Sequence, residues 1–168
     1  MMKKVGTIGA ASLALGSAAV AMAVPASAQL QYRQKIAHNA AQCNGTRGPA
    51  VWITINGIRE SRGTLRVQSY RGVESDWLQK GKWINRIELP ARAGQMNVCM
   101  PVPGSGTYAI AVRHDVNGNG DTDLREDGGG MSNNPSINIF NLGKPSYKKT
   151  AFSVDGGVKP ITITMRYW

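Results

Sequence analysis

The residues best suited to do chemistry in this chain lie together between His114 and Asp127, in the stretch HDVNGNGDTDLRED. With Asp115 as position one, the stretch completes the calcium-loop pattern D-x-[DN]-x-[DN]-G-x5-E, and Gly120 falls at the sharp turn. Calcium takes about six to eight hard oxygen ligands, and this spacing lets side chains, a backbone carbonyl and a late carboxylate surround one ion. We therefore predict a calcium site built from the following residues: Asp115, Asn117, Asn119, Asp121, Asp123 and Glu126.

This loop departs from an EF-hand in two ways. Position eight is Thr122 where an aliphatic residue is usual, and the residues before the loop predict a strand where a helix would be expected. A metal-free turn is the alternative, since Asn-Gly steps form turns without an ion. However, five of the ten acidic residues lie in this loop, and Arg125 is its only internal positive charge. We expect weak, stabilising calcium binding with a Kd of about 0.1 to 1 mM, as in extracellular calcium modules.

His114 is the residue beside the loop that could act as an acid or a base. It continues the alternating row Tyr108, Ile110 and Val112, so we expect it to close the core and to hydrogen-bond a loop carboxylate. A zinc site would need partners, and the only other histidine, His38, lies in an N-terminal arm. The chain also lacks the nucleophile motif G-x-S-x-G. We predict no catalytic activity; the alternative is an enzyme that uses His114 and the loop acids.

The first 28 residues have the order of a secretory signal: two lysines, a run of small apolar residues, and the cleavage pattern Ala26-Ser27-Ala28. We predict cleavage before Gln29 and a periplasmic or secreted product. A membrane anchor is the alternative, although Pro25 interrupts the apolar run. No later segment is apolar for long enough to span a bilayer, so we predict no transmembrane segment in the mature chain.

Two cysteines, Cys43 and Cys99, are predicted to form a disulfide, because an isolated pair in an oxidising compartment is usually bridged. Closing so long a loop would contribute about 4 kcal/mol in the chain-entropy model. A reactive thiol or a metal ligand is the alternative, but neither cysteine lies in a C-x-x-C motif or beside a histidine.

The chain is strongly basic, with 20 Lys and Arg against 10 Asp and Glu, and its acids are concentrated in the loop. A basic exported protein suggests an anionic envelope partner such as lipopolysaccharide, an acidic glycan or anionic phospholipid; solubility alone is the alternative. Nucleic acid is not expected, because the compartment is wrong and the positive residues do not form a run. The segment Tyr70 to Arg86 interleaves aromatic and cationic residues and could bind glycans, or Trp83 could be core with Trp77 exposed.

The elements that must position these residues are predicted to be strands. No apolar stripe at helical spacing continues for three turns, and glycine-containing turns such as Asn56-Gly57 separate the alternating rows. About seven strands are expected, near residues 51–55, 65–68, 83–89, 96–102, 108–114, 151–154 and 161–167. The pattern predicts an all-β, antiparallel sandwich of immunoglobulin-like or transthyretin-like type over residues 49–168. Residues 29–48 are predicted to form an N-terminal arm, in which Gln31 to Gln42 form a short helix or are unstructured.

The order G-T-Y-A-I-A-V-R-H-D-V-N-G-N-G-D-T-D over residues 106–123, followed by S-N-N at 132–134, resembles the bacterial family called domain of unknown function 2141. The resemblance covers roughly Val51 to Tyr167 and implies an exported single-domain sandwich without implying an activity. The matching positions are His114, Asp115, Asn117, Asn119, Gly120, Asp123, Ser132, Asn133 and Asn134. Five of them are expected to support the loop: His114, Gly120, Ser132, Asn133 and Asn134. The chain departs from the family between Glu126 and Met131, where three glycines replace a proline-containing element and are expected to make the loop mobile unless an ion orders it.

The sequence therefore predicts an exported cell-envelope binding or structural module with a structural calcium loop. The alternative is a calcium-free interaction module that binds an anionic envelope glycan or lipid.

Overall fold

A computed structural model gives the structure of the chain and describes residues 30–123, 125–137 and 143–167. The predicted leader, residues 1–28, and its cleavage point before Gln29 lie outside the described residues. None of the helices in the described part of the chain has the length and apolar character needed to cross a membrane.

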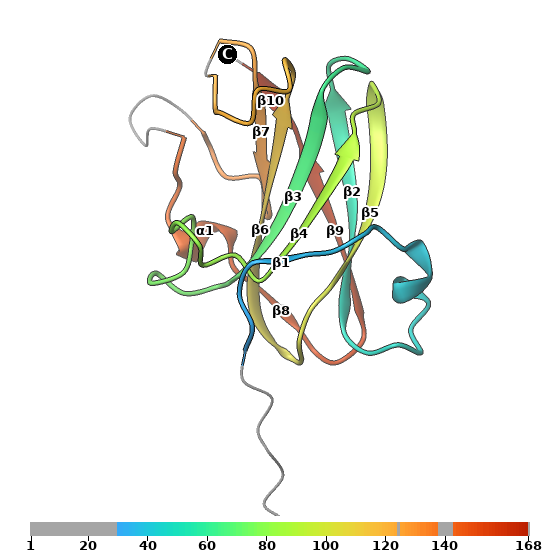
Figure 1. The fold of residues 1–168 in the computed structure, drawn as a ribbon. Helices are drawn as coiled ribbons and strands as arrows, with labels where there is room; N and C mark the ends of the chain where they lie inside the picture. Colours follow the sequence, from blue (N-terminus) through green and yellow to red (C-terminus); the bar gives the residue numbers. More distant parts are fainter. Residues whose placement is uncertain (1–29, 124, 138–142, 168) are drawn as a thin grey trace, which may run out of the picture.

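The protein is all-β, as predicted (Figure 1). The predicted alternating rows correspond to seven strands and a short C-terminal one, and two further strands, β1 and β7, were not predicted. In chain order the elements are β1 (Gln34–Lys35), the 3-10 helix η1 (Ala40–Cys43), β2 (Ala50–Ile58), β3 (Thr64–Arg71), β4 (Asn85–Pro90), β5 (Gly94–Pro101), β6 (Gly106–Asp115), β7 (Gly128–Met131), α1 (Tyr147–Thr150), β8 (Phe152–Val154), β9 (Val158–Thr164) and β10 (Arg166–Tyr167).

These strands form two sheets. The larger has the order β1-β4-β3-β6-β7-β10, with β8 also paired to β6, and the smaller has the order β5-β2-β9. Most pairs are antiparallel, but the prediction of a purely antiparallel fold is wrong, because β2 pairs with β9 and β1 with β4 in parallel. The sheets are therefore mixed. Alternation of side chains has the same period in both arrangements, so it did not reveal the parallel pairs.

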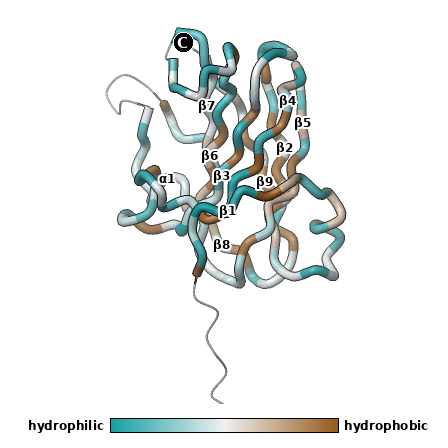
Figure 2. Tube along the Cα trace, viewed as in Figure 1, coloured by the Kyte–Doolittle hydropathy of each residue, from teal (hydrophilic) through white to brown (hydrophobic). Residues whose placement is uncertain are grey.

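The core lies between the two sheets and is built from the apolar sides of their strands. Figure 2 shows the alternation of apolar and polar residues along the strands. On β6 the predicted inward row is confirmed, because Tyr108, Ile110, Val112 and His114 are all buried. The smaller sheet contributes, among others, Ile53 of β2 to the same cluster. Burying a side chain of this size typically stabilises a fold by about 1.5 to 3 kcal/mol.

The glycines after the loop form strand β7, whereas the sequence predicts a mobile loop unless an ion orders it. Gly128 and Gly130 are buried, and β7 pairs with β6 on one side and β10 on the other. A Cβ atom on Gly128 would clash with the ring of Tyr167, and one on Gly130 would lie 2.7 Å from Ile163 Cγ2. Glycine is required here by close packing, which overrides its low preference for strands.

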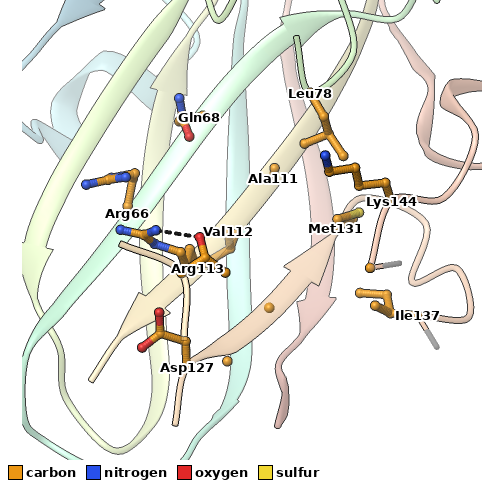
Figure 3. A pocket seen from close by; sticks show the side chains of 14 residues that line it. Arg66, Gln68, Leu78, Ala111, Val112, Arg113, Asp127, Met131, Ile137 and Lys144 are labelled. Atoms are coloured by element: carbon orange, nitrogen blue, oxygen red, sulfur yellow. Dashed lines mark hydrogen bonds between the residues drawn. The ribbon is translucent and has the colours of Figure 1, made fainter. Parts of the chain in front are cut away.

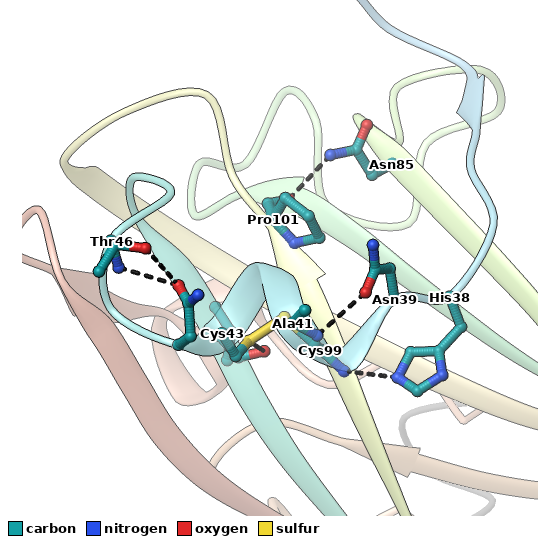
Figure 4. Close-up of a disulfide and its surroundings, with 10 residues drawn as sticks. His38, Asn39, Ala41, Cys43, Thr46, Asn85, Cys99 and Pro101 are labelled. Atoms are coloured by element: carbon teal, nitrogen blue, oxygen red, sulfur yellow. Dashed lines mark hydrogen bonds between the residues drawn. A yellow bond between two sulfur atoms is a disulfide. The ribbon is translucent and has the colours of Figure 1, made fainter.

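The N-terminal arm is held to the sheets by a disulfide and by a hydrogen bond from Tyr32 to the buried carboxylate of Asp76. Cys43, at the end of η1, is bonded to Cys99 of β5, which confirms the predicted pairing and fits an oxidising compartment (Figure 4). His38, also in the arm, accepts a hydrogen bond from Cys99 N at 3.2 Å. The prediction of a helix or an unstructured arm therefore holds in part, since η1 is helical and β1 joins the larger sheet.

Asp76 anchors the start of the same arm to the larger sheet. Its carboxylate, 1% exposed, accepts hydrogen bonds from Arg71 Nε at 2.6 Å and Nη2 at 3.0 Å and from the Tyr32 hydroxyl at 2.6 Å. These contacts, with the Arg71 hydrogen bonds dominant, lower the pKa of Asp76 to about 2 even though burial opposes the charged form.

Candidate functional site

The acidic loop leaves β6 at Asp115 and returns to the sheet at Gly128, so both of its ends are fixed by strands. Asp115 is buried and braces the loop from within. Its Oδ1 accepts from Gly118 N and its Oδ2 from Gly120 N, both at 2.9 Å, while Arg113 Nη2 lies 3.1 Å from Oδ2. Gly120 has a φ of +85°, a left-handed conformation that glycine adopts without strain. Asp115 and Gly120 thus set the shape of the turn.

Four of the six predicted calcium ligands converge on the exposed side of this loop. Asn117 Nδ2 donates to Asp123 Oδ2 at 2.8 Å and to Glu126 Oε2 at 3.0 Å, and Asn119 Nδ2 donates to Asp123 Oδ2 at 2.7 Å. These amide hydrogen bonds, those of Asn117 first, lower the pKa of Asp123. Two carboxylates therefore meet at one point, and the electropositive ends of two amides are directed to it.

The other two predicted ligands lie elsewhere. Asp115 directs its oxygens to the loop backbone, and the exposed Asp121 has its own backbone N–H bonded to Asn119 Oδ1 at 2.8 Å. Within the described ranges, no three His, Cys, Asp or Glu side chains are grouped so that they could hold a metal ion in this arrangement. Oxygen donors are nevertheless abundant, since all four converging side chains carry one.

Asp127 closes the loop, and the calcium pattern, which ends at Glu126, gave no reason to single it out. Its side chain is buried, and its two oxygens accept from Val116 N at 3.1 Å and from Asp123 N at 3.0 Å. It therefore ties the start of the loop to its end. Burial of an acidic residue directly before a strand is the signal that could have identified it, but burial is not readable from one sequence.

His114 is fully buried, as predicted, but it does not hydrogen-bond a loop carboxylate. Its Nε2 lies 2.7 Å from the carbonyl of Arg62 and its Nδ1 lies 2.7 Å from the Tyr167 hydroxyl. A carbonyl only accepts, so Nε2 carries a proton, and in a neutral imidazole Nδ1 then accepts from the Tyr167 hydroxyl. The hydroxyl in turn accepts from Arg59 N at 3.0 Å. The imidazole thus joins β10 to the β2–β3 turn.

The triplet Ser132, Asn133 and Asn134 supports a different part of the fold from the loop. Buried Ser132 Oγ accepts from Ile110 N at 3.0 Å and donates to Thr150 O at 2.6 Å. Asn133 Nδ2 donates to the Ala151 carbonyl, and Asn134 bonds β9 through both its amide atoms. Both asparagines have positive φ, which asparagine tolerates better than most residues. The triplet therefore connects β6, α1 and β9.

The interleaved segment Tyr70 to Arg86 also differs from its prediction, because Trp77 is buried as well as Trp83. The two indoles belong to a small apolar cluster on the outer face of the larger sheet, with Tyr70 stacked edge-on against Trp77. Trp77 Nε1 donates to Pro145 O at 2.8 Å, and the Arg86 guanidinium lies 4.1 Å from the Trp83 ring centre. These rings serve packing and present no open aromatic face.

These features define an all-β protein of two mixed sheets that carries an acidic loop at the end of a central strand. The chain belongs to the family DUF2141, described as an uncharacterized protein conserved in bacteria, whose profile matches residues 53–162. This confirms the resemblance found in the motif residues. No curated protein and no solved structure matches the chain.

Proposed function

We propose that the protein is an exported envelope module whose loop, Asp115 to Asp127, binds calcium weakly to stabilise the fold. The observation that carries the proposal is the convergence of Asp123 and Glu126 on the Asn117 amide nitrogen. An amide N–H group carries a partial positive charge, and a cation at this point would satisfy both carboxylates more strongly. Rotation of the exposed Asn117 and Asn119 amides would bring their oxygens toward the ion.

The ligands in this proposal are Asp123, Glu126, Asn117 and Asn119, and backbone carbonyls and water would complete the coordination. Asp115 keeps its structural bonds to the loop backbone and contributes charge near the site. Two direct carboxylates favour weak binding, in the range of about 0.1 to 1 mM. Binding of this strength suits a compartment in which calcium is always present, and a role in which the bound ion stabilises the fold.

Export and the finer fold type are part of the same proposal. The leader pattern at residues 1–28 and the disulfide both support a periplasmic or secreted location. The two facing sheets support an immunoglobulin-like or transthyretin-like sandwich.

We propose a binding or structural role and no catalytic one. Both ring nitrogens of His114 are engaged in a fully buried site, which supports a packing role for the imidazole in this proposal.

The test is thermal unfolding of the purified protein in chelator and in 10 mM calcium or magnesium. With a Kd of about 0.1 to 1 mM, calcium at this concentration should stabilise the folded state by about 1.4 to 2.7 kcal/mol. The double variant Asp123→Asn, Glu126→Gln should lose this response, whereas Asp155→Asn, in a turn outside the loop, should keep it. An equal melting temperature with and without calcium would reject the proposal.

A further inference from the structure

A cavity of about 310 Å³ lies on the outer face of the larger sheet, over β3, β6 and β7 (Figure 3). Ala111 of β6 and Gln68 of β3 form part of its floor. Its size is at the lower end of the range of small-molecule sites, about 300 to 1,000 Å³. The cavity therefore suits a small ligand.

The two ends of this cavity differ in chemistry, as Figure 3 shows. Leu78, Met131 and Ile137 lie at one end, together with the exposed Lys144. Arg66 and Arg113 lie at the other end with Asp127, whose two oxygens already accept from Val116 N and Asp123 N. Such a division is typical of sites that hold an apolar body and fix a charged group.

The two arginines at the polar end are cross-strand neighbours, since Arg66 of β3 pairs in register with Arg113 of β6. Like charges directly opposite each other destabilise a sheet. Each is partly neutralised: Arg66 Nε bonds Glu88 at 2.8 Å, and Arg113 bonds Asp115 and the Thr122 hydroxyl. However, Arg113 Nε is buried and has no hydrogen-bond partner in the described part of the chain. A buried donor without an acceptor destabilises the fold, and a ligand that supplies the acceptor relieves this cost.

A third guanidinium, that of Arg86 on β4, adds to this crowding. Its Nε is likewise buried without a partner among the described residues. Burial, followed by the charge of Arg66, lowers the pKa of Arg86. Beside the polar end of the cavity, two guanidinium Nε donors therefore lack an acceptor among the described residues.

We propose that this cavity binds a small organic anion, a carboxylate with an apolar body of the size of a medium-chain fatty acid. The carboxylate accepts hydrogen bonds from Arg66 and Arg113, and the body lies over Ala111 against Leu78 and Met131. Charge-assisted bonds between guanidinium and carboxylate are among the strongest in proteins, and burial of the chain adds a hydrophobic gain. The site goes beyond the calcium proposal, because neither Asp123 nor Glu126 lines it.

The test is isothermal titration of the purified protein with octanoate, with 1-octanol as the uncharged probe of equal chain length. Octanoate should bind one site, and 1-octanol should bind at least tenfold more weakly. Arg66→Gln removes one charged donor and should weaken octanoate binding at least tenfold, whereas Arg47→Gln, an exposed arm residue outside the cavity, should change it less than twofold. Ala111→Phe fills the floor and should abolish binding.

Melting curves establish that each variant is folded, and if Ala111→Phe is not, Arg66→Gln decides alone. Equal binding of the two probes, binding of neither, or full octanoate affinity in Arg66→Gln would overturn the proposal. Titrations in chelator and in calcium should agree, so that failure of the calcium proposal leaves this result unchanged.

Discussion

Replacing Asp127 with asparagine should destabilise the fold although Asp127 is outside the calcium pattern. The two carboxylate oxygens accept from the buried Val116 N–H and from the part-buried Asp123 N–H. Asparagine has one acceptor oxygen, so its NH2 group must face one of these donors. A side chain that keeps its oxygen toward Val116 leaves the part-buried N–H of Asp123 without its partner. Loss of one such bond costs about 1 to 3 kcal/mol, and partial access of water to Asp123 N places the cost near 1 to 2 kcal/mol.

Urea unfolding of Asp127→Asn measures this cost. With a slope of about 2 kcal/mol per molar, the midpoint should fall by about 0.5 to 1 M. The control is Asp121→Asn, which makes the same chemical change at an exposed position of the same loop and should shift stability by less than about 0.5 kcal/mol. If the two variants unfold at the same midpoint, the carboxylate of Asp127 does not close the loop.

Three further predictions concern the frame that holds the loop. Because Asp76 has a folded-state pKa of about 2, its ion pair with Arg71 stabilises the fold fully above the unfolded-state pKa of about 4. About 2 kcal/mol of the free energy of unfolding should be lost as pH falls from 4 to 2, and urea unfolding of Asp76→Asn should not show this loss. Replacing Cys43 and Cys99 together with serine should cost about 4 kcal/mol in the chain-entropy model, and a loss below about 1 kcal/mol in denaturant unfolding would contradict it. Gly63→Ala should lower the free energy of unfolding by at least about 2 kcal/mol, because Gly63 has a φ of +71° and a Cβ there would clash with the backbone at the end of β6. Calorimetry measures this loss, and a near-neutral result would contradict that packing.

Much of the fold could be predicted from local patterns, because burial between two sheets imposes alternation on each strand. The row from Tyr108 to His114 is an example, since one face of β6 had to be apolar. Strand β7 could not be found in this way. Its glycines give no alternation, and they are required by Tyr167 and Ile163, which reach them from the distant C-terminal segment.

The candidate site was predictable in outline and not in detail. Spacing placed Asn117, Asn119, Asp123 and Glu126 in one loop, and the structure brings them together. Spacing did not reveal that the carboxylate of Asp115 would bond the loop backbone. The cavity beside the loop was also hidden, because the pairing of Arg66 with Arg113 depends on strand register across 47 positions of sequence.

Isothermal titration calorimetry of the purified protein is the sharpest test of calcium binding by the loop from Asp115 to Asp127. We expect a saturable heat for one calcium site with a Kd of about 0.1 to 1 mM, absent in the variant Asp123→Asn, Glu126→Gln and retained in Asp155→Asn. Heats of dilution alone, or an unchanged calcium heat in the double variant, would contradict it.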